Sequence, residues 1–417
     1  MPSPTRSGAG PARSCATSSP RRSSACPTPR TTEESRPVDF NLSEEQEALQ
    51  EMARGFLSER WPAERVRELL DARPVLIDDD VWKEIVEMGW LGVAASEEAG
   101  GIGGDVMTAA VLCQEAGRGV LPGPFQSSLV AAIAIERSGD KDLCSGLLPG
   151  LIEGKRRVSV AIEEPGGLYG PDAVRTEARA AGEDWLLTGN KILVPEGNEA
   201  EHLLVAARTP DGLGLVRVAA DAEGATTTRM DRMDGQSCAA LVFEDAKAEA
   251  GALLGGADRG EALLREVYDI WTALVAADLL GSAEASLELT RSYATERVQF
   301  GRPIGSFQAV SHRLADTLVD VEIGRSLLYG ACLALDEGRD NAAPLVSAAK
   351  AWLSETAVAA AEAALQIHGG VGFTWEYDVH LHLRRSRCNA ALLGDADHHR
   401  DRVAAYMEQS WVPLVKA

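Results

Sequence analysis

The sequence lacks any long run of apolar residues, and this argues against a membrane span. Nowhere in the 417 residues does an uninterrupted apolar run come near the length of about 18 residues that a bilayer-crossing helix needs. Positive charge is also scarce, since 41 Lys and Arg stand against 63 Asp and Glu, for a net charge of −22. Nucleic acids and anionic membranes bind basic faces, so neither is expected as a partner.

Disulfide patterns and common cofactor loops are missing too. The seven cysteines contain no Cys-x-x-Cys pair, and this usage is typical of free thiols in a reducing compartment, which predicts a cytoplasmic protein. No Gly-x-x-x-x-Gly-Lys-Ser/Thr loop is present, and no Gly-x-Gly-x-x-Gly follows a strand, so a classical nucleotide-binding fold is not supported. His380 and His382 belong to no closed ligand set, and no metal is expected.

Residues 1–37 contain no Leu, Ile, Val, Phe, Tyr or Trp. Such a segment cannot bury enough apolar surface to offset its ordering entropy, so we predict a disordered tail over 1–37. The pair Arg21-Arg22 resembles an export signal, but no apolar region follows it, and export is not expected. The alternative for this segment is that the physiological start lies near Val38.

Three regions with different patterns of apolar residues follow the tail. Residues 38–155 show amphipathic helical periodicity that begins at a capping box, Ser43 with Gln46. Residues 156–255 consist of short apolar runs separated by Gly, Pro, Asp and Asn, without helices between them. Long helical patterns fill residues 256–417, and the second of them carries an apolar stripe predicted to be buried: Phe307, Val310, Leu314, Leu318 and Val321. The sequence therefore predicts a mostly α fold: an N-terminal all-α domain, a small antiparallel β-domain and a C-terminal bundle like a four-helix bundle.

Two glycine-containing segments stand between the long helical patterns. Residues 296–308 read E-R-V-Q-F-G-R-P-I-G-S-F-Q and contain an arginine that cannot lose its charge. Residues 366–373 read Q-I-H-G-G-V-G-F and supply glycines where a backbone can approach a ligand closely. On these residues alone, the segments are either phosphate-binding loops or ordinary interhelical turns.

Together, the two segments resemble the signature of the acyl-CoA dehydrogenase family. The pattern R-x-Q-F-G-x-P-I-G-x-F-Q is followed by Q-x-H-G-G-x-G-F, and the similarity covers residues 38–417, including the opening D-F-x-L-S-E-E-Q and the loop 96–101. The resemblance implies FAD as cofactor, an acyl-CoA thioester as substrate, α,β-dehydrogenation and an electron-transfer acceptor protein. It also implies the helix–β–helix order of regions.

The resemblance assigns seven cofactor-binding residues. Arg297 would meet the FAD pyrophosphate, with Gln299 and Phe300 beside it and Gln308 on the following helix, while Gln366, Gly369 and Gly370 would line the adenosine side. In this family, these positions reach into the flavin site of a neighbouring subunit. The resemblance therefore also implies an oligomer.

The part of the family pattern that holds the isoalloxazine ring differs in this chain. The turn 163–170 reads E-E-P-G-G-L-Y-G, with Glu163 where the family has a hydroxyl residue. The strand that reads W-[IV]-T in the family reads Leu193, Val194 and Pro195 here, and proline removes a backbone donor. The contacts that the family makes to the ring are thus replaced.

The catalytic base of the family is replaced as well. The usual glutamate aligns with Leu393, and the glutamate of branched-chain members aligns with Trp271. Asp278 lies seven residues after Trp271, on the same face of the predicted helix. Its apolar surroundings favour a raised pKa, so Asp278 is the candidate general base. The alternative is an interhelical salt bridge.

Three functions follow from these observations. The first is an FAD-dependent acyl-CoA dehydrogenase that uses Asp278. The second is a non-catalytic partner subunit of a mixed assembly, a dimer of dimers in which a homologous chain supplies the base. The third is a flavin-free helical scaffold. Arg384, Arg385 and Arg387 are a candidate basic site for CoA, with a solvated helix face as the alternative.

Overall fold

The computed structural model describes residues 41–70 and 74–410, so the predicted tail 1–37 lies outside the described residues. The first region is helical. Its α-helices are α1 (Glu44–Arg60), α2 (Ala63–Leu70), α3 (Asp79–Glu87), α4 (Val106–Arg118), α5 (Phe125–Ser138), α6 (Lys141–Gly146) and α7 (Leu148–Ile152). The capping box is confirmed: the Ser43 side chain accepts from the Gln46 backbone N–H, and the Gln46 side chain accepts from that of Ser43.

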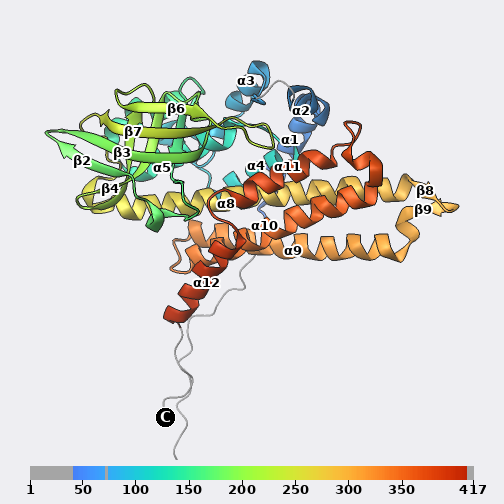
Figure 1. The fold of residues 1–417 in the computed structure, drawn as a ribbon. Helices are drawn as coiled ribbons and strands as arrows, with labels where there is room; N and C mark the ends of the chain where they lie inside the picture. The colour runs from blue at the N-terminus through green and yellow to red at the C-terminus, as the bar shows by residue number, and fades with distance from the viewer. Residues whose placement is uncertain (1–40, 71–73, 411–417) are drawn as a thin grey trace, which may run out of the picture. The chain divides into compact units, whose positions relative to one another are not determined.

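The middle region is a curled sheet of seven strands (Figure 1). They are β1 (Val158–Ala161), β2 (Glu177–Ala181), β3 (Asp184–Pro195), β4 (His202–Thr209), β5 (Gly212–Ala219), β6 (Ala225–Arg229) and β7 (Cys238–Ala248). The order is β1-β4-β2-β3-β7-β6, and β5 pairs with β4. Most pairs are antiparallel as predicted, but β1 and β2 run parallel to β4.

The last region contains three long helices that lie side by side (Figure 1): α8 (Gly256–Glu296), α9 (Gln308–Asp336) and α10 (Ala342–His368). The short strands β8 (Val298–Gln299) and β9 (Arg302–Pro303) connect α8 to α9, and α11 (Val379–Ala391) and α12 (Ala396–Ser410) complete the region. One helix, α8, is long and apolar enough to cross a membrane, but 94% of its apolar window is buried inside the protein. It is the core of the bundle.

Two glycines let α4 pack directly on α8. A Cβ on Gly117 would lie 2.1 Å from the carbonyl oxygen of Asp278, and a Cβ on Gly281 would lie 1.8 Å from that of Gln114. Neither position tolerates a side chain while the backbones stay in place. The crossing fixes Asp278 at the contact between the N-terminal helices and the bundle.

The predicted burial of the apolar stripe on α9 is wrong for this chain taken alone. Of its five residues only Val321 is buried, and Leu318 is 48% exposed. The first half of α9 packs on its neighbours along one side, so the remaining apolar side chains have no cover within the described residues.

Candidate functional site

The seven predicted cofactor-binding residues are all exposed at one end of the bundle. Arg297 caps the C-terminal end of α8, and Gln299 lies in β8. Phe300 forms the turn of the β8–β9 hairpin with φ of +53° and is 92% exposed. Gln308 begins α9, whereas Gln366, Gly369 and Gly370 lie at the end of α10 and just beyond it.

An aromatic contact brings the two motifs together. Tyr293 lies one helical turn before Arg297, and its ring stacks on that of His368 with centroids 4.2 Å apart. His368 directly precedes Gly369, and its Nδ1 lies 2.8 Å from the Ala364 carbonyl oxygen. Both motifs therefore face outward from the same end of α8 and α10.

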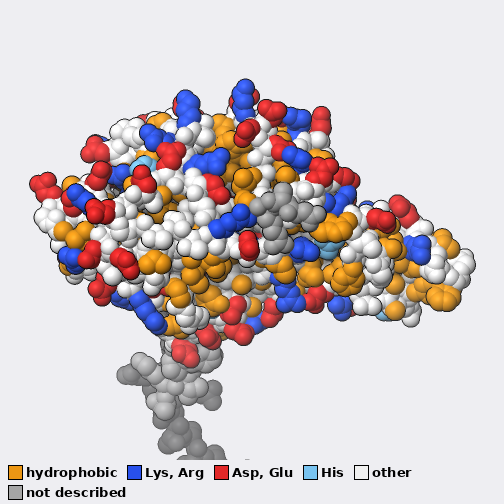
Figure 2. All heavy atoms as spheres, turned by 45° about the horizontal axis from the view of Figure 1, so that its top comes forward, with side chains coloured by type: hydrophobic (Ala, Val, Ile, Leu, Met, Phe, Trp, Pro, Cys, Tyr) orange, Lys and Arg blue, Asp and Glu red, His pale blue; other side chains and the backbone are white. Residues whose placement is uncertain are grey.

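This end of the bundle fits the diphosphate and adenosine portion of a dinucleotide. Arg297 has no ion-pair partner among the described residues, so its guanidinium is available to an anion. No atom lies within 4 Å of a Cβ built on Gly369 or Gly370, and Gly369 has φ of +65°. Four large apolar side chains in or next to the two motifs are exposed, namely Val298, Phe300, Phe373 and Trp375. Figure 2 shows hydrophobic side chains on the surface of the narrow end of the molecule. Such exposure marks a surface that another molecule covers.

Some of the positions that depart from the family pattern lie together at a second place inside the chain. Pro195 and Trp271, together with Leu392, line one small cavity, whose volume is about 20 Å³. Leu393, at the position of the family's base, is fully buried beside it. A cavity of this size holds about one water molecule. It has no room for an acyl thioester.

Asp278 lines the same cavity in a buried ion pair. Its carboxylate accepts hydrogen bonds from Arg385, at 2.6 Å from Nη2 to Oδ2 and 3.0 Å from Nε to Oδ1, and from Asn389 Nδ2 at 2.8 Å. Asp278 is 1% exposed and Arg385 is 4% exposed. Arg385 also donates to the Leu121 carbonyl oxygen. This arrangement supports the interhelical salt bridge, and the catalytic role of Asp278 stays a prediction.

A second buried pair adjoins the first. Arg232 donates to both carboxylate oxygens of Asp234, at 3.0 and 2.8 Å, and to Asn389 Oδ1 at 3.1 Å. Arg385 Nη1 lies 3.8 Å from Asp234 Oδ2. Two arginines thus face two aspartates, and the charges of these four side chains balance. Sequence reasoning missed these partners, although Arg385 and Asn389 share a helix face at a spacing of four residues.

Glu196 fills the space between the β-domain and the N-terminal helices. It follows Pro195, has φ of +49°, and is 6% exposed. A Cβ on Gly123 would lie 1.7 Å from its Oε1, so the glycine makes room for the carboxyl. Burial raises the pKa of Glu196 to about 7. The side chain occupies the end of the strand that holds the flavin ring in the family.

The turn 163–170 is also filled by side chains of this chain. Glu163 is buried, its Oε1 has no hydrogen-bond partner, and burial raises its pKa to about 7. Glu164 accepts a 2.7 Å hydrogen bond from the buried Lys191 and another from Thr176. The hydroxyl that the family presents to the ring is therefore replaced by a desolvated carboxyl group.

Three side chains fix the turn at Leu393. Its carbonyl oxygen accepts from Tyr268 Oη at 2.5 Å and lies 3.0 Å from His399 Nε2. Lys350 donates to the carbonyl oxygens of Ala390 and Gly394, at 3.1 and 3.0 Å. The turn therefore keeps the apolar Leu393 in the core.

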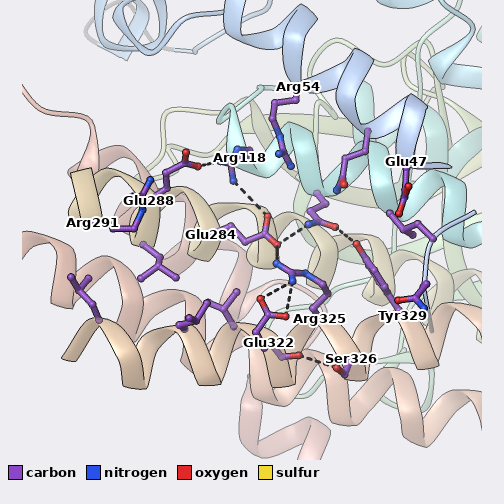
Figure 3. Close-up of a pocket in the computed structure, with 18 of the residues that line it drawn as sticks. Glu47, Arg54, Arg118, Glu284, Glu288, Arg291, Glu322, Arg325, Ser326 and Tyr329 are labelled. Carbon is purple, nitrogen blue, oxygen red and sulfur yellow. Dashed lines mark hydrogen bonds and ion pairs between the residues drawn. The ribbon is translucent and has the colours of Figure 1, made fainter. Parts of the chain in front are cut away.

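A cavity with a volume of about 860 Å³ lies elsewhere, between α1, α4, α8 and α9 (Figure 3). Glu284 stands at its centre, where it accepts from Arg325 and Gln114 at 2.7 and 2.9 Å and lies 3.6 Å from Arg118. Tyr329 Oη donates to Gln114 at 3.0 Å. These polar groups satisfy one another, and none of the predicted site residues lines this cavity.

The candidate basic site for CoA does not form. Arg385 is buried against Asp278, Arg387 pairs with Glu362, and Arg384 donates to the Met233 carbonyl oxygen. The three side chains diverge because α11 directs Arg385 into the core.

Comparison with known proteins gives the family. A model described as "Acyl-CoA dehydrogenase, N-terminal domain" matches residues 43–155, and one described as "Acyl-CoA dehydrogenase, C-terminal domain" matches residues 262–408. The mouse (Mus musculus) long-chain specific acyl-CoA dehydrogenase is 31% identical over 315 residues, which are 73% of each chain. The chain belongs to the acyl-CoA dehydrogenase family. The predicted fold class and the oxidoreductase chemistry of CoA thioesters with FAD are confirmed at the level of this family.

Two similar solved structures each carry the names of two proteins. The Tcur3481-Tcur3483 steroid ACAD, solved as a variant, is 35% identical, with a TM-score of 0.81 over 88% of this chain and 98% of that one. The ChsE4-ChsE5 complex from Mycobacterium tuberculosis is 29% identical, with a TM-score of 0.83 over 90% of this chain and 100% of that one.

Proposed function

We propose that this chain is a subunit of an FAD-dependent acyl-CoA dehydrogenase in which a homologous chain supplies the flavin-ring cradle and the catalytic base. One contrast supports the proposal. The residues that would serve a neighbour's flavin are intact and exposed, namely Arg297, Gln299, Phe300, Gln308, Gln366, Gly369 and Gly370. The place where this chain would hold its own acyl group has a volume of about 20 Å³.

FAD, when bound, supplies the acceptor for the hydride that leaves the β-carbon of the thioester. This chain's part is to hold the far end of the cofactor. Arg297 would pair with the diphosphate, a charge-assisted contact that a planar guanidinium makes through two hydrogen bonds. Gly369 and Gly370 would let the backbone approach the adenosine side. An electron-transfer acceptor protein completes the reaction.

The dehydrogenase that uses its own Asp278 is less well supported. A general base needs a free carboxylate within reach of the α-proton, and both oxygens of Asp278 accept hydrogen bonds from Arg385 or Asn389. The third alternative, a flavin-free scaffold, gives no role to the exposed Arg297 or to the open surface at Gly369 and Gly370. The five described cysteines are unpaired, which supports a reducing, cytoplasmic location.

The test is FAD content and flavin reduction, measured for the chain alone and after co-expression with homologous chains of its own genome that carry a glutamate before the glycine aligned with Gly394. Alone, the chain should retain little FAD and show no bleaching with acyl-CoA under anaerobic conditions. Together, the complex should hold FAD and be reduced. A stable assembly of this chain alone with one FAD per chain and full turnover would refute the proposal.

Arg297→Ala sharpens the experiment. The variant removes a charge-assisted contact of about 1.5–3 kcal/mol to the diphosphate, so the complex should lose FAD on dialysis. Arg313→Ala is the matched control, because Arg313 is also exposed, lies a few residues into α9 and has no place in the proposed site. Equal FAD retention by both variants would show that Arg297 does not hold the cofactor.

A further inference from the structure

A cluster of three rings lies next to the two exposed motifs. The ring of Tyr293 stacks on that of His368, with centroids 4.2 Å apart and an interplanar angle of 19°. Tyr377 closes the cluster, because its ring meets that of Tyr293 edge-on at 5.6 Å and that of His368 at 5.4 Å. The three residues come from α8, from α10 and from the segment before α11. The cluster therefore joins three separate parts of the chain at one point.

The stacked pair continues directly into both motifs. The carbonyl oxygen of Tyr293 accepts a 2.8 Å hydrogen bond from the backbone N–H of Arg297. Arg297 in turn leads into the β8–β9 hairpin beyond the end of α8 (Figure 1). On the other side, His368 is the last residue of α10 and directly precedes Gly369. A single ring contact thus links the backbone of the first motif to that of the second.

A hydrogen bond fixes the orientation of the His368 ring. Its Nδ1 lies 2.8 Å from the carbonyl oxygen of Ala364, which can only accept, so Nδ1 carries the proton. His368 is 5% exposed, and burial lowers its pKa, so the ring is neutral at neutral pH. A neutral ring held in one rotation presents a fixed face to Tyr293. A phenylalanine at this position would keep a ring but lose the bond that holds it.

We propose that Tyr293 and His368 are positioning residues of the FAD site, whose stacked rings hold Arg297 and Gly369 at the separation that the cofactor needs. The identity of the ligand rests on the proposed function. Both motifs are exposed, and no atom lies within 4 Å of a Cβ built on Gly369 or Gly370, so contacts of the motif residues themselves do little to hold them. Binding groups on such segments need support from the residues behind them, since affinity depends on their being in place before the ligand arrives.

The first test needs no cofactor. Amide hydrogen exchange is measured for the chain alone, in peptides that cover residues 297–307 and 366–373. Tyr293→Leu removes the ring, so exchange should become about two- to tenfold faster in both peptides, the factor that corresponds to one stacked aromatic pair. Tyr293→Phe keeps the ring and should exchange like the parent. Tyr406→Leu is the matched control, because Tyr406 on α12 is half-buried like Tyr293 and lies outside the cluster, and it should leave both peptides unchanged.

The second test uses the complex with the homologous chain. Tyr293→Leu should raise the dissociation constant of FAD by about two- to tenfold, and excess FAD should restore full occupancy. The flavin that stays bound should be bleached by acyl-CoA at the parent's rate, because neither residue is placed at the reacting atoms. His368→Phe should lose less affinity than His368→Leu, because it keeps the ring and loses only the bond to Ala364.

Unchanged exchange of the 366–373 peptide in Tyr293→Leu would overturn the proposal, as would an FAD affinity equal to that of the parent complex. A loss that Tyr293→Phe shares would also overturn it, because the hydroxyl and not the ring would then be the cause. Failure of the proposed function looks different. Arg297→Ala would then leave the FAD content unchanged, while exchange in both peptides would still respond to Tyr293→Leu. The link between the two motifs would stand in that case, and its use for FAD would not.

Discussion

Replacing Asp278 separates a structural carboxylate from a catalytic one. In Asp278→Asn, the side chain keeps its shape but loses its charge, and the amide nitrogen turns a donor toward Arg385 or Asn389. Arg385 stays protonated because its ordinary pKa is far above neutrality, and burial at 4% exposure keeps water away from it. The variant therefore leaves the buried cation with the Leu121 carbonyl oxygen and the more distant carboxylate of Asp234, at 3.8 Å.

The expected loss of stability follows from the loss of this ion-pair partner. Removing one partner of a buried ion pair typically costs about 3–5 kcal/mol, and an unsatisfied Asn389 amide adds about 1 kcal/mol or more. Against a total stability of about 5–15 kcal/mol for a folded protein, this is a large fraction. We expect the urea midpoint of Asp278→Asn to fall sharply with an unchanged slope.

A compensating variant tests the cause. Asp278→Leu with Arg385→Met replaces the pair by apolar side chains of similar size, which often costs little. The double variant should be more stable than either single variant, and this coupling is the signature of an ion pair. If Asp278→Asn unfolds within about 1 kcal/mol of the parent and abolishes flavin reduction in a complex that keeps its FAD, the ion-pair reasoning is refuted and Asp278 is the base.

Two further predictions concern packing and pH. Gly117→Ala should lower the free energy of unfolding by more than about 1–3 kcal/mol, because its Cβ would lie 2.1 Å from a backbone oxygen of α8. Gly55→Ala in α1 is the control: nothing lies within 4 Å of its Cβ. This variant should be neutral or stabilising in the same urea unfolding experiment. The pKa of Glu196 is raised from 4.5 to about 7, so the folded state holds this proton longer and loses stability as pH rises from about 4.5 through 7. Glu196→Gln should therefore gain in unfolding free energy relative to the parent across that window, and a constant difference between pH 4.5 and 7.5 would contradict the assignment.

The fold was largely predictable because the helical regions and the β-domain differ in their pattern of apolar residues. No apolar run marks the strands β2 and β6, since Glu-Ala-Arg-Ala-Ala and Ala-Thr-Thr-Thr-Arg contain no large apolar residue. Their pairing with β3 and β7 stabilises them. Two of the short apolar runs of the β-domain, at residues 185–187 and 192–194, lie in one bulged strand, β3. Local patterns do not show that a bulge continues a strand.

The candidate site was predictable only in part, and the reason is sequence distance. Helical periodicity placed Asp278 on an inward face correctly, but its partner Arg385 lies 107 residues later. No periodicity tells which side chain meets it. The α9 stripe shows the opposite limit: its pattern predicts burial, and most of it is not covered by any of the residues that the structure describes.

The ion pairs also weaken the binding of any acyl-CoA that would enter this chain's own cavity. Asp278 comes from α8, Arg385 from α11, and Arg232 from the segment before β7, so the pairs join the bundle to the β-domain. A thioester between these elements would have to separate at least one pair, at about 3–5 kcal/mol. At 1.4 kcal/mol per factor of ten, that weakens a micromolar ligand by more than a hundredfold. In the proposed assembly with a homologous chain, acyl-CoA is therefore expected to bind in the homologous chain's cavity. This chain would contribute the residues at the end of its bundle.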